Sequence, residues 1–262
     1  MKIAVLGANG FVGSNIAKSL NRHHTVQAIT RSTIDLLDGL AVGRWLETER
    51  YDCVINAAAV MKDDRGIDDT RNNLGIFMNF YTLRNLYGKF INMASGAEYD
   101  RARNINCARE FEIFSHMPQD SYGFGQNMKS RLSAVTPGFY NLRIFNCFGR
   151  GEIQTRIFPR LLAVSQFTVS NDRYFDFFSI QDLLSVVEHF VENDVTVKDV
   201  NCVYDTKLLI SQAVELFCHV RQLNPKISVV SCSSNNYTGS HDNLYSLNIE
   251  LQGLEQGFKD YE

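Results

Sequence analysis

A glycine-rich turn near the start of the chain limits the possible folds more than any other feature. Residues 3–13 read Ile-Ala-Val-Leu-Gly-Ala-Asn-Gly-Phe-Val-Gly. The apolar run 3–6 predicts a buried strand, and Ile16, Ala17 and Leu20 have the spacing of a helix that follows directly. Such a strand-to-helix turn directs backbone N–H groups at one point, which predicts a pyrophosphate site. The expected contacts are Gly7, Asn9, Gly10, Phe11, Val12 and Gly13.

Strand and helix patterns alternate along the first half of the 262-residue chain. Strand patterns at 25–30, 51–56 and 90–93 are separated by helical stretches. The alternation predicts an α/β fold with a doubly wound parallel sheet, a Rossmann sheet, whose ligands lie at the carboxyl ends of the strands. Aromatic residues at 174–178 predict a further strand, whereas 97–121 is expected to be a polar loop.

Beyond residue 150 the alternation weakens, although no repeat or linker marks a break. We therefore expect a lobe boundary there rather than a hinge between independent domains. Residues 1–150, joined by 173–198, are expected to form the Rossmann dinucleotide-binding domain. Residues 151–172 and 199–262 are expected to form a small C-terminal α/β lobe that binds the substrate.

The composition excludes several classes of protein. The formal net charge of −3 gives no basis for a nucleic-acid partner, and no apolar run is long enough to span a membrane. Because the chain enters a strand at once, we expect no signal peptide and a cytoplasmic protein. The histidines and cysteines show no metal-ligand spacing, so no metal is expected. Reduced, mostly buried thiols are expected at Cys53, Cys107, Cys147, Cys202, Cys218 and Cys232.

The end of the second predicted strand bears on the choice of cofactor. In dinucleotide-binding folds an acidic residue there binds the adenosine ribose, whereas an arginine suits a 2′-phosphate. Arg31 follows this strand with no acid beside it. We therefore expect NADP(H), with NAD possible; the alternative is that Arg31 is a solvated surface residue. Ala57, Ala58 and Ala59 end the third strand, where small residues leave room for a ligand across the sheet.

Motifs along nearly the whole chain resemble those of the extended short-chain dehydrogenase/reductases that modify nucleotide sugars, the NAD-dependent epimerase/dehydratase superfamily. Residues 7–13 are similar to the glycine signature of that family, 56–59 (Asn-Ala-Ala-Ala) to its strand-end motif and 73–75 (Asn-Leu-Gly) to the start of its central helix. Residues 142–149 (Leu-Arg-Ile-Phe-Asn-Cys-Phe-Gly) and 176–183 resemble two signatures on the nucleotide-sugar side. The resemblance implies cofactor contacts from Ala57, Ala58, Ala59 and Asn73.

The resemblance also implies a catalytic centre. Ser95 lies where the family has its catalytic Ser or Thr, and Tyr122 lies at the catalytic Tyr, the proton donor to a carbonyl oxygen. The family reads Y-x-x-x-K, but this chain has Gln126 four residues after Tyr122. Gln126 keeps a hydrogen bond to the cofactor ribose but supplies no charge, so the pKa of Tyr122 is expected to stay close to that of a free phenol. Of two nearby lysines, Lys129 is expected at the surface, and Lys62 within reach of the mouth of the site.

Departures from the family narrow the expected reaction. Dehydratases of the family have Asp-Glu after the Ser or Thr, where this chain has Gly96 and Ala97. The acid/base pair of the epimerising reductases is also missing. The nearest resemblance is to reductases of 4-keto-6-deoxy sugar nucleotides, so the expected function is NADPH-dependent reduction of a 4-keto nucleotide sugar in deoxysugar biosynthesis for surface polysaccharide. The alternatives are a nucleotide-sugar epimerase with bound NAD, and a catalytically weak partner subunit that binds cofactor.

Substrate and assembly follow from the same resemblance. Asn146 and Arg143 are expected to hold the nucleotide diphosphate, although a structural ion pair is the alternative for Arg143. The helical stretches 67–87 and 122–136 resemble those that pair in the dimer interface of the family, which implies a homodimer. The outer faces of these helices are expected to carry Phe77, Phe80 or Met128.

Overall fold

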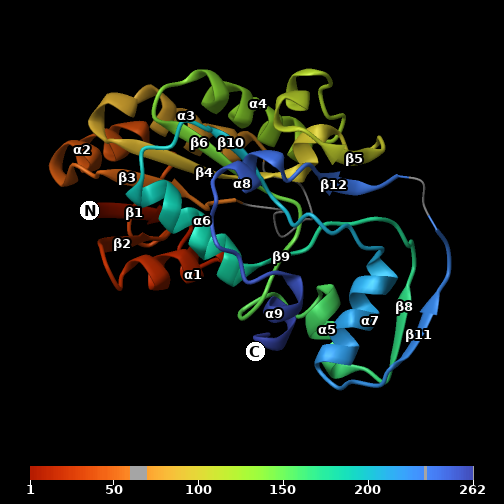
Figure 1. The fold of residues 1–262 in the computed structure, drawn as a ribbon. Coiled ribbons are helices and arrows are strands. Elements are labelled where there is room, and N and C mark those ends of the chain that lie inside the picture. The colour runs from red at the N-terminus through yellow and green to blue at the C-terminus, as the bar shows by residue number, and fades with distance from the viewer. Residues whose placement is uncertain (60–69, 233–234, 262) are drawn as a thin grey trace.

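The computed structural model describes residues 1–59, 70–232 and 235–261. One sheet of six parallel strands has the order β10-β6-β4-β3-β1-β2, and a smaller lobe lies beside it (Figure 1). This order, with helices on both faces, confirms the doubly wound α/β fold. The strands of the sheet are β1 (Lys2–Leu6), β2 (Thr25–Ile29), β3 (Cys53–Asn56), β4 (Lys89–Ser95), β6 (Phe139–Ile144) and β10 (Asp199–Cys202).

Helices cover the two faces of the sheet through apolar stripes. On α6 (Ile180–Glu192), Leu183, Val186, Val187 and Phe190 recur at helical spacing and are fully buried together with residues of α1 (Phe11–Leu20). The opposite face is covered by α2 (Gly39–Glu49), α3 (Thr70–Thr82) and α4 (Ser121–Val135).

The inner face of α3 corrects one expectation from the sequence. Phe77 and Phe80 have no exposed surface and pack on Phe90 of β4 and Phe139 of β6. They therefore belong to the core and do not lie on an outer face, whereas Met128 is half-buried. The aromatic side chains turn inward because that face of the sheet is apolar and must be covered.

A row of buried polar side chains crosses four neighbouring strands. Asn56 Nδ2 donates to Asn92 Oδ1 at 3.1 Å, and Asn92 Nδ2 donates to Asn141 Oδ1 at 3.3 Å. Asn141 Nδ2 then donates to Asp199 Oδ1 at 2.7 Å. These four residues are direct neighbours in the register of β3, β4, β6 and β10. A shift of one residue would leave buried amides unpaired, so the row fixes the register of the sheet.

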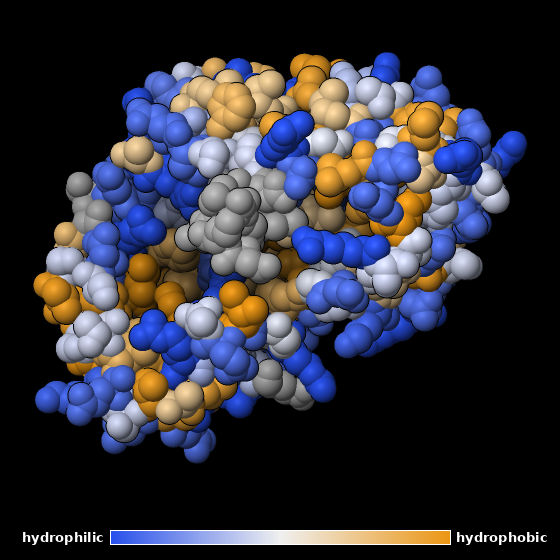
Figure 2. Space-filling view, turned by 180° about the vertical axis from the view of Figure 1, so that it is seen from behind, coloured by the Kyte–Doolittle hydropathy of each residue, from blue (hydrophilic) through white to orange (hydrophobic). Residues whose placement is uncertain are grey.

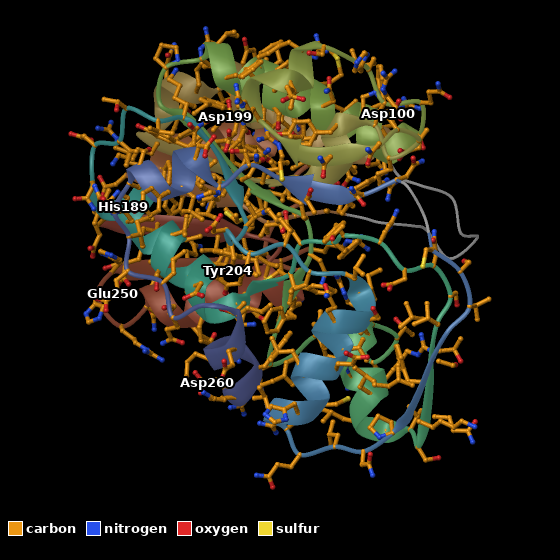
Figure 3. The ribbon with its side chains drawn as sticks, turned by 45° about the vertical axis from the view of Figure 1, so that its right-hand side comes forward. Asp100, His189, Asp199, Tyr204, Glu250 and Asp260 are labelled. Carbon is orange, nitrogen blue, oxygen red and sulfur yellow. The ribbon has the colours of Figure 1, made fainter. Side chains whose placement is uncertain are left out.

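The small lobe is built around an aromatic cluster. Its helices α5 (Ile157–Ala163), α7 (Ile210–Val220) and α9 (Leu254–Lys259) meet at the fully buried rings of Phe158, Phe217 and Phe258. Its outer edge is a parallel pair of strands, β8 (Gln166–Val169) and β11 (Lys226–Val229). Tyr204, labelled in Figure 3, lies in the connection between the sheet and this lobe and donates to Asp182 at 2.5 Å.

The stretch expected to be a polar loop is in part regular. A 3₁₀ helix (Gly96–Tyr99) follows β4 directly, and β5 (Ile105–Ala108) pairs in parallel with β12 (Tyr237–Gly239); a second 3₁₀ helix spans Glu110–Phe114. The aromatic stretch 174–178 is not a continuous strand: it makes single bridges, and only its end joins β9 (Phe178–Ser179), which pairs with β7 (Cys147–Phe148).

The boundary of the small lobe also differs from the expectation. β10 forms the edge of the main sheet, and α8 (Asp242–Ser246) packs on it through the buried Leu244. Residues 199–202 and this helix therefore pack with the Rossmann part, where β10 pairs with the backbone N–H and C=O groups of β6 that would otherwise form an open edge.

Two further expectations concern the surface. In the part of the chain that the structure describes, no helix is long and apolar enough to cross a membrane. Four of the six cysteines are buried, as expected. Cys107 and Cys232 are exposed, so the expectation of a buried thiol is wrong at these two positions.

Candidate active site

The glycine turn brings the ends of β1, β3 and α1 into close contact. Gly7 has a φ of 73°, and a Cβ there would lie 2.7 Å from the Ala57 oxygen. A Cβ on Gly13 would lie 2.4 Å from the Gly7 oxygen. Only glycine permits both approaches. Small residues at both positions therefore keep the N-terminus of α1 against the sheet edge.

The first turn of α1 offers backbone donors. Gly10 is its N-cap and provides no side-chain cap, and the turn contains no acidic residue. Among the described residues, the N–H groups of Phe11, Val12 and Gly13 have no acceptor. Such a helix N-terminus suits a pyrophosphate. Asn9 and Gly10 are exposed beside it, and Ala58 and Ala59 lie at the end of β3 across from it.

Arg31 lies directly after β2 and is exposed. Beside it the Thr30 hydroxyl lies 2.8 Å from that of Ser32 and 3.2 Å from that of Thr33. An exposed guanidinium group with hydroxyls beside it is a chemically suitable place for a phosphate. Asn73 is buried on α3, and Lys62 falls outside the described residues.

Ser95, Tyr122 and Gln126 come together at the carboxyl edge of the sheet. Ser95 ends β4, three residues beyond the amide row, and its hydroxyl accepts from Ala97 N at 3.3 Å. Tyr122 and Gln126 lie one turn apart on α4, whose N-cap Asp120 accepts from Gly123 N at 2.8 Å. Ser95 and Gln126 both lie close enough to the Tyr122 side chain to lower its pKa.

The environment of Tyr122 keeps its phenol protonated. Burial raises its pKa, and Ser95 and Gln126 only partly oppose that effect. The pKa therefore lies above that of a free phenol, which corrects the sequence-based expectation. The surroundings that raise this pKa were not visible in the sequence because they include segments far along the chain.

Gln126 carries an unpaired buried atom. Its Oε1 has no hydrogen-bond partner among the described residues, and the side chain is buried. A buried carbonyl oxygen without a donor is costly. A ribose hydroxyl would supply that donor, so Gln126 fits the role of a ribose contact.

Three residues near Tyr122 were missed by sequence reasoning. Tyr237 on β12 is buried and lies close enough to Ser95 and Tyr122 for both to affect its pKa. The Arg101 guanidinium lies 5.7 Å from the centre of the Tyr122 ring. Arg173 lies 5.9 Å from the centre of the Tyr237 ring and makes no ion pair among the described residues. All three come from segments without a recognisable motif, so only the fold brings them together.

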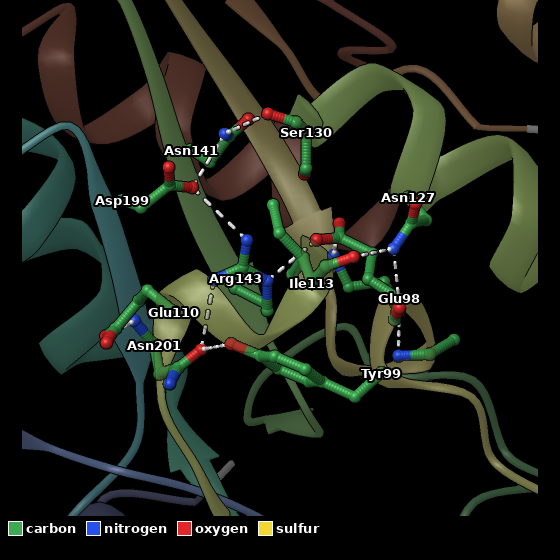
Figure 4. Close-up of polar contacts among 12 residues, drawn as sticks. Glu98, Tyr99, Glu110, Ile113, Asn127, Ser130, Asn141, Arg143, Asp199 and Asn201 are labelled. Atoms are coloured by element: carbon green, nitrogen blue, oxygen red, sulfur yellow. Dashed lines mark hydrogen bonds and ion pairs between the residues drawn. The ribbon is translucent and has the colours of Figure 1, made fainter. Parts of the chain in front are cut away.

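Arg143 does not face a ligand site. Its side chain has no exposed surface, and its Nε donates to Glu98 Oε2 at 2.7 Å while its Nη2 donates to Asp199 Oδ1 at 3.2 Å (Figure 4). Nη1 donates to Asn201 Oδ1 at 3.1 Å. The structural ion pair, one of the two interpretations open from the sequence, is therefore correct, and diphosphate binding by Arg143 is not.

The ion pair between Arg143 and Glu98 also helps to position Ser95. Glu98 Oε1 accepts from Ser95 N at 2.9 Å, as one half of a capping box at the start of the 3₁₀ helix. Burial raises the pKa of Glu98, and the charge of Arg143 opposes that rise. Arg143 thus holds the turn that presents the Ser95 hydroxyl.

Asn146 lies near the lobe boundary and is mostly buried. Its Oδ1 accepts from Arg156, whose Nε also lies 2.9 Å from Glu152 Oε1. Asn146 is therefore already paired within the chain, and Arg156 is the partly exposed cation beside it.

Packing explains why no acid follows Ser95. A Cβ on Gly96 would lie 2.6 Å from the Phe145 ring, and a Cβ on Gly239 would lie 2.7 Å from the same ring. Phe145 also stacks on Tyr99, at 6.0 Å between ring centres. A side chain at position 96 would displace this ring, so the dehydratase-like Asp has no room here.

Lys129 is buried and is not a surface residue as expected. Its exposed fraction is 2%, and burial lowers its pKa to about 8 while Glu98 partly opposes the change. It points inward because α4 is covered on that side by the segments around Glu98. Nothing places it beside Tyr122.

The face behind the view of Figure 1 is hollowed between the Rossmann part and the small lobe (Figure 2). Two cavities of about 300 Å³ and 480 Å³ lie elsewhere, around Tyr204 with His241 and around Phe111 with Lys198. Neither is lined by Ser95 or Tyr122, so they are separate from the candidate site. In the part of the chain that the structure describes, no group of His, Cys, Asp and Glu side chains is arranged to hold a metal.

Comparison with known sequences extends these observations. A sequence model of the NAD dependent epimerase/dehydratase family matches residues 3–202. The ADP-L-glycero-D-manno-heptose-6-epimerase of Cupriavidus pinatubonensis (strain JMP 134 / LMG 1197) is 29% identical over 185 residues, which cover 58% of this chain and 53% of that protein. The chain thus spans about half the length of this curated relative.

Solved structures share the fold along the whole chain. A dTDP-4-dehydrorhamnose reductase from Clostridium acetobutylicum superposes with a TM-score of 0.82 at 17% identity, and covers 100% of this chain and 98% of its own. A GDP-mannoheptose C4 reductase from Campylobacter jejuni, with NADP bound, has a TM-score of 0.80 at 17% identity, with 99% and 96% covered. At this identity the likeness establishes the fold.

Proposed function

Because the chain belongs to the NAD dependent epimerase/dehydratase family, we propose that it is an NADPH-dependent reductase of a 4-keto nucleotide sugar. The observation that carries this proposal is that Ser95 at the end of β4 and Tyr122 in the first turn of α4 lie together at the carboxyl edge of the sheet, where burial raises the pKa of Tyr122 and keeps its phenol protonated. The bound nicotinamide supplies the hydride. Tyr122 Oη donates the proton to the carbonyl oxygen, and the Ser95 hydroxyl hydrogen-bonds to that oxygen.

The residues of the glycine turn fit a dinucleotide. The backbone of Phe11, Val12 and Gly13 would bind the pyrophosphate, with Gly7, Asn9 and Gly10 lining it. Gln126 Oε1 would accept a ribose hydroxyl, and Arg31 would bind a 2′-phosphate. Ala57, Ala58, Ala59 and Asn73 would complete the site along β3 and α3.

The direction of the reaction follows from Gln126. A protonated phenol donates a proton readily, but it is a poor base for removing one from an alcohol at neutral pH. Without a lysine at position 126, the site favours ketone reduction over alcohol oxidation. The Campylobacter jejuni GDP-mannoheptose C4 reductase, which was crystallised with NADP, shares the fold. This likeness is consistent with ketone reduction as the proposed reaction.

The substrate diphosphate would lie at the lobe boundary. Arg173, beside Tyr237, and Arg156, beside Asn146, are partly exposed cations there and replace Arg143 as the candidates. The sugar would then reach Ser95 and Tyr122 in the hollow between the two parts of the molecule (Figure 2).

The test is consumption of NADPH with a panel of 4-keto-6-deoxy sugar nucleotides carrying dTDP or GDP. We expect turnover with at least one member, and a loss of at least a hundredfold in Tyr122→Phe. Equal rates in both proteins would refute the assignment of Tyr122.

Two other functions would give different results in the NADPH-consumption assay. An epimerase with bound NAD would interconvert sugars without consuming cofactor, and the heptose epimerase relative favours testing it. A catalytically weak partner subunit would bind cofactor but turn over nothing. As a reductase the chain would act in deoxysugar biosynthesis for surface polysaccharide, in the cytoplasm and as a homodimer.

A further inference from the structure

Gln126 carries no positive charge, but an arginine from another segment lies close to Tyr122. Arg101 lies in the turn after the 3₁₀ helix Gly96–Tyr99, and its guanidinium carbon is 5.7 Å from the centre of the Tyr122 ring. The side chain is about half exposed. Arg101 is therefore a partly hydrated cation close to the Tyr122 ring, whereas Gln126 is buried one turn further along α4.

Two contacts hold Arg101 in this place. Its Nη2 donates to Asp120 Oδ1 at 2.6 Å, and the same oxygen accepts from Gly123 N as the N-cap of α4. The turn itself is closed by Arg103 N, which donates to the Asp100 oxygen at 2.9 Å. The guanidinium is thus tied to the helix end that carries Tyr122, so the two side chains keep their relative position.

The charged and titratable groups around Tyr122 come from several elements. Glu98 on the 3₁₀ helix raises the pKa of Tyr122, and Arg101 lowers it. Tyr237 on β12 is neutral at physiological pH because burial raises its pKa. Arg173 lies over Tyr237, and its pKa is lowered by burial and by the charge of Arg101.

We propose that Arg101 is a positioning residue that supplies, through Tyr122, the charge that a lysine at position 126 would otherwise provide. The proposal rests on the proposed function, in which Tyr122 is the proton donor. Asp120 and water weaken the field of a half-exposed guanidinium, so its effect is smaller than that of a buried lysine. It offsets part of the burial effect and still leaves the phenol protonated.

The test is a direct titration of Tyr122 in the absence of substrate and cofactor. The full chain is produced with 3-fluorotyrosine, and the fluorine resonance of Tyr122 is identified as the one missing in Tyr122→Phe. In Arg101→Gln we expect the pKa of Tyr122 to rise by about half to one unit. In Gln126→Lys we expect it to fall by about two units.

Two controls separate a local charge from a general effect. Arg101→Lys should restore most of the shift, because the charge is kept. Arg103→Gln removes the same charge from an exposed residue of the same turn and should leave the Tyr122 resonance in place. Added salt should raise the pKa of Tyr122 in the wild type more than in Arg101→Gln.

An unmoved pKa in Arg101→Gln would overturn the proposal, and so would an equal shift in Arg103→Gln. If Arg101→Gln lowers the melting temperature, the test is the effect of salt on the pKa of Tyr122 in the wild type. A pKa that does not change with salt would then contradict the proposal. Since no substrate is used, this result is independent of whether NADPH is consumed in the turnover assay.

Discussion

Individual side chains in this protein take their roles from burial more than from residue type. Arg143 and Arg101 are both arginines beside a carboxylate, yet the first is fully buried and the second about half exposed. The sequence predicted Ser95, Tyr122 and Gln126 as site residues because each lies in a motif. It could not identify Tyr237 or Arg101, since their contacts join segments more than twenty residues apart.

Loss of the Arg143 side chain should destabilise the whole protein. Arg143→Met leaves the fully buried Glu98 and the partly buried Asp199 without their shared cation, which costs about 3–5 kcal/mol in free energy of unfolding. Urea unfolding followed by circular dichroism measures the loss. Arg103→Gln, at an exposed arginine, should change the stability by less than about 0.5 kcal/mol. A loss below 1 kcal/mol in Arg143→Met would contradict a structural ion pair.

Arg31 should distinguish the two nicotinamide cofactors. Arg31→Ala removes the cation proposed to bind a 2′-phosphate, so the affinity for NADPH should fall about tenfold while that for NADH stays the same. Calorimetric titration of both cofactors measures this, with the exposed Arg22→Ala as control. Tighter binding of NADH than NADPH by the wild type would show that the choice of cofactor is wrong.

At the scale of elements, periodicity predicted most of the Rossmann part. The strands at the centre of the sheet and the amphipathic α6 carry their own patterns, so local sequence was sufficient. The pairing of β5 with β12 was not predictable in this way, because each is four residues or shorter and their partner lies far along the chain. For the same reason the segment 97–121 was interpreted as a loop.

Asp176 joins the strand of Tyr237 to the small lobe, and its ionisation should affect stability. Oδ2 accepts from Gly239 N at 2.8 Å, and Lys207 Nζ lies 2.9 Å from Oδ1. Burial raises the pKa of Asp176 to about 6 from 3.8, against the opposing effect of Lys207. The folded state therefore binds the proton more tightly than the unfolded state.

The contribution of Asp176 is accordingly largest below pH 4 and declines as the pH rises to about 6. The free energy of unfolding of the wild type relative to Asp176→Asn should fall by at most about 3 kcal/mol over that range. Denaturation at pH 4 and pH 7.5 measures the difference, with the exposed Asp205→Asn as control. A difference that rises with pH would contradict the raised pKa.

At the scale of the whole molecule, apolar side chains remain exposed on the face made by α3 and α4. Met78 on α3 and Phe124 and Val135 on α4 are 37%, 40% and 71% exposed. The sequence had predicted Phe77 and Phe80 on the outer face, but Met78, Phe124 and Val135 are the exposed apolar residues of these helices. An apolar face on two neighbouring helices fits the proposed homodimer.

Phe124→Glu should therefore dissociate the dimer. A charge placed in an apolar interface costs several kcal/mol, which is enough to shift a micromolar equilibrium to monomer. Light scattering at micromolar concentration measures the mass. Leu162→Glu, at an exposed leucine of the small lobe, should leave the dimer intact. A monomeric wild type would refute the proposed assembly.

In the proposed reaction, Ser95 and Tyr122 reduce a 4-keto nucleotide sugar with NADPH. The most direct measurement uses NADPH that carries deuterium at the transferable position of the nicotinamide, with mass spectrometry of the sugar nucleotide. We predict one deuterium at carbon 4 of the product for each NADPH consumed, and almost none with Tyr122→Phe. Conversion of the sugar without deuterium or loss of NADPH, or no conversion of any 4-keto sugar nucleotide, would contradict the account.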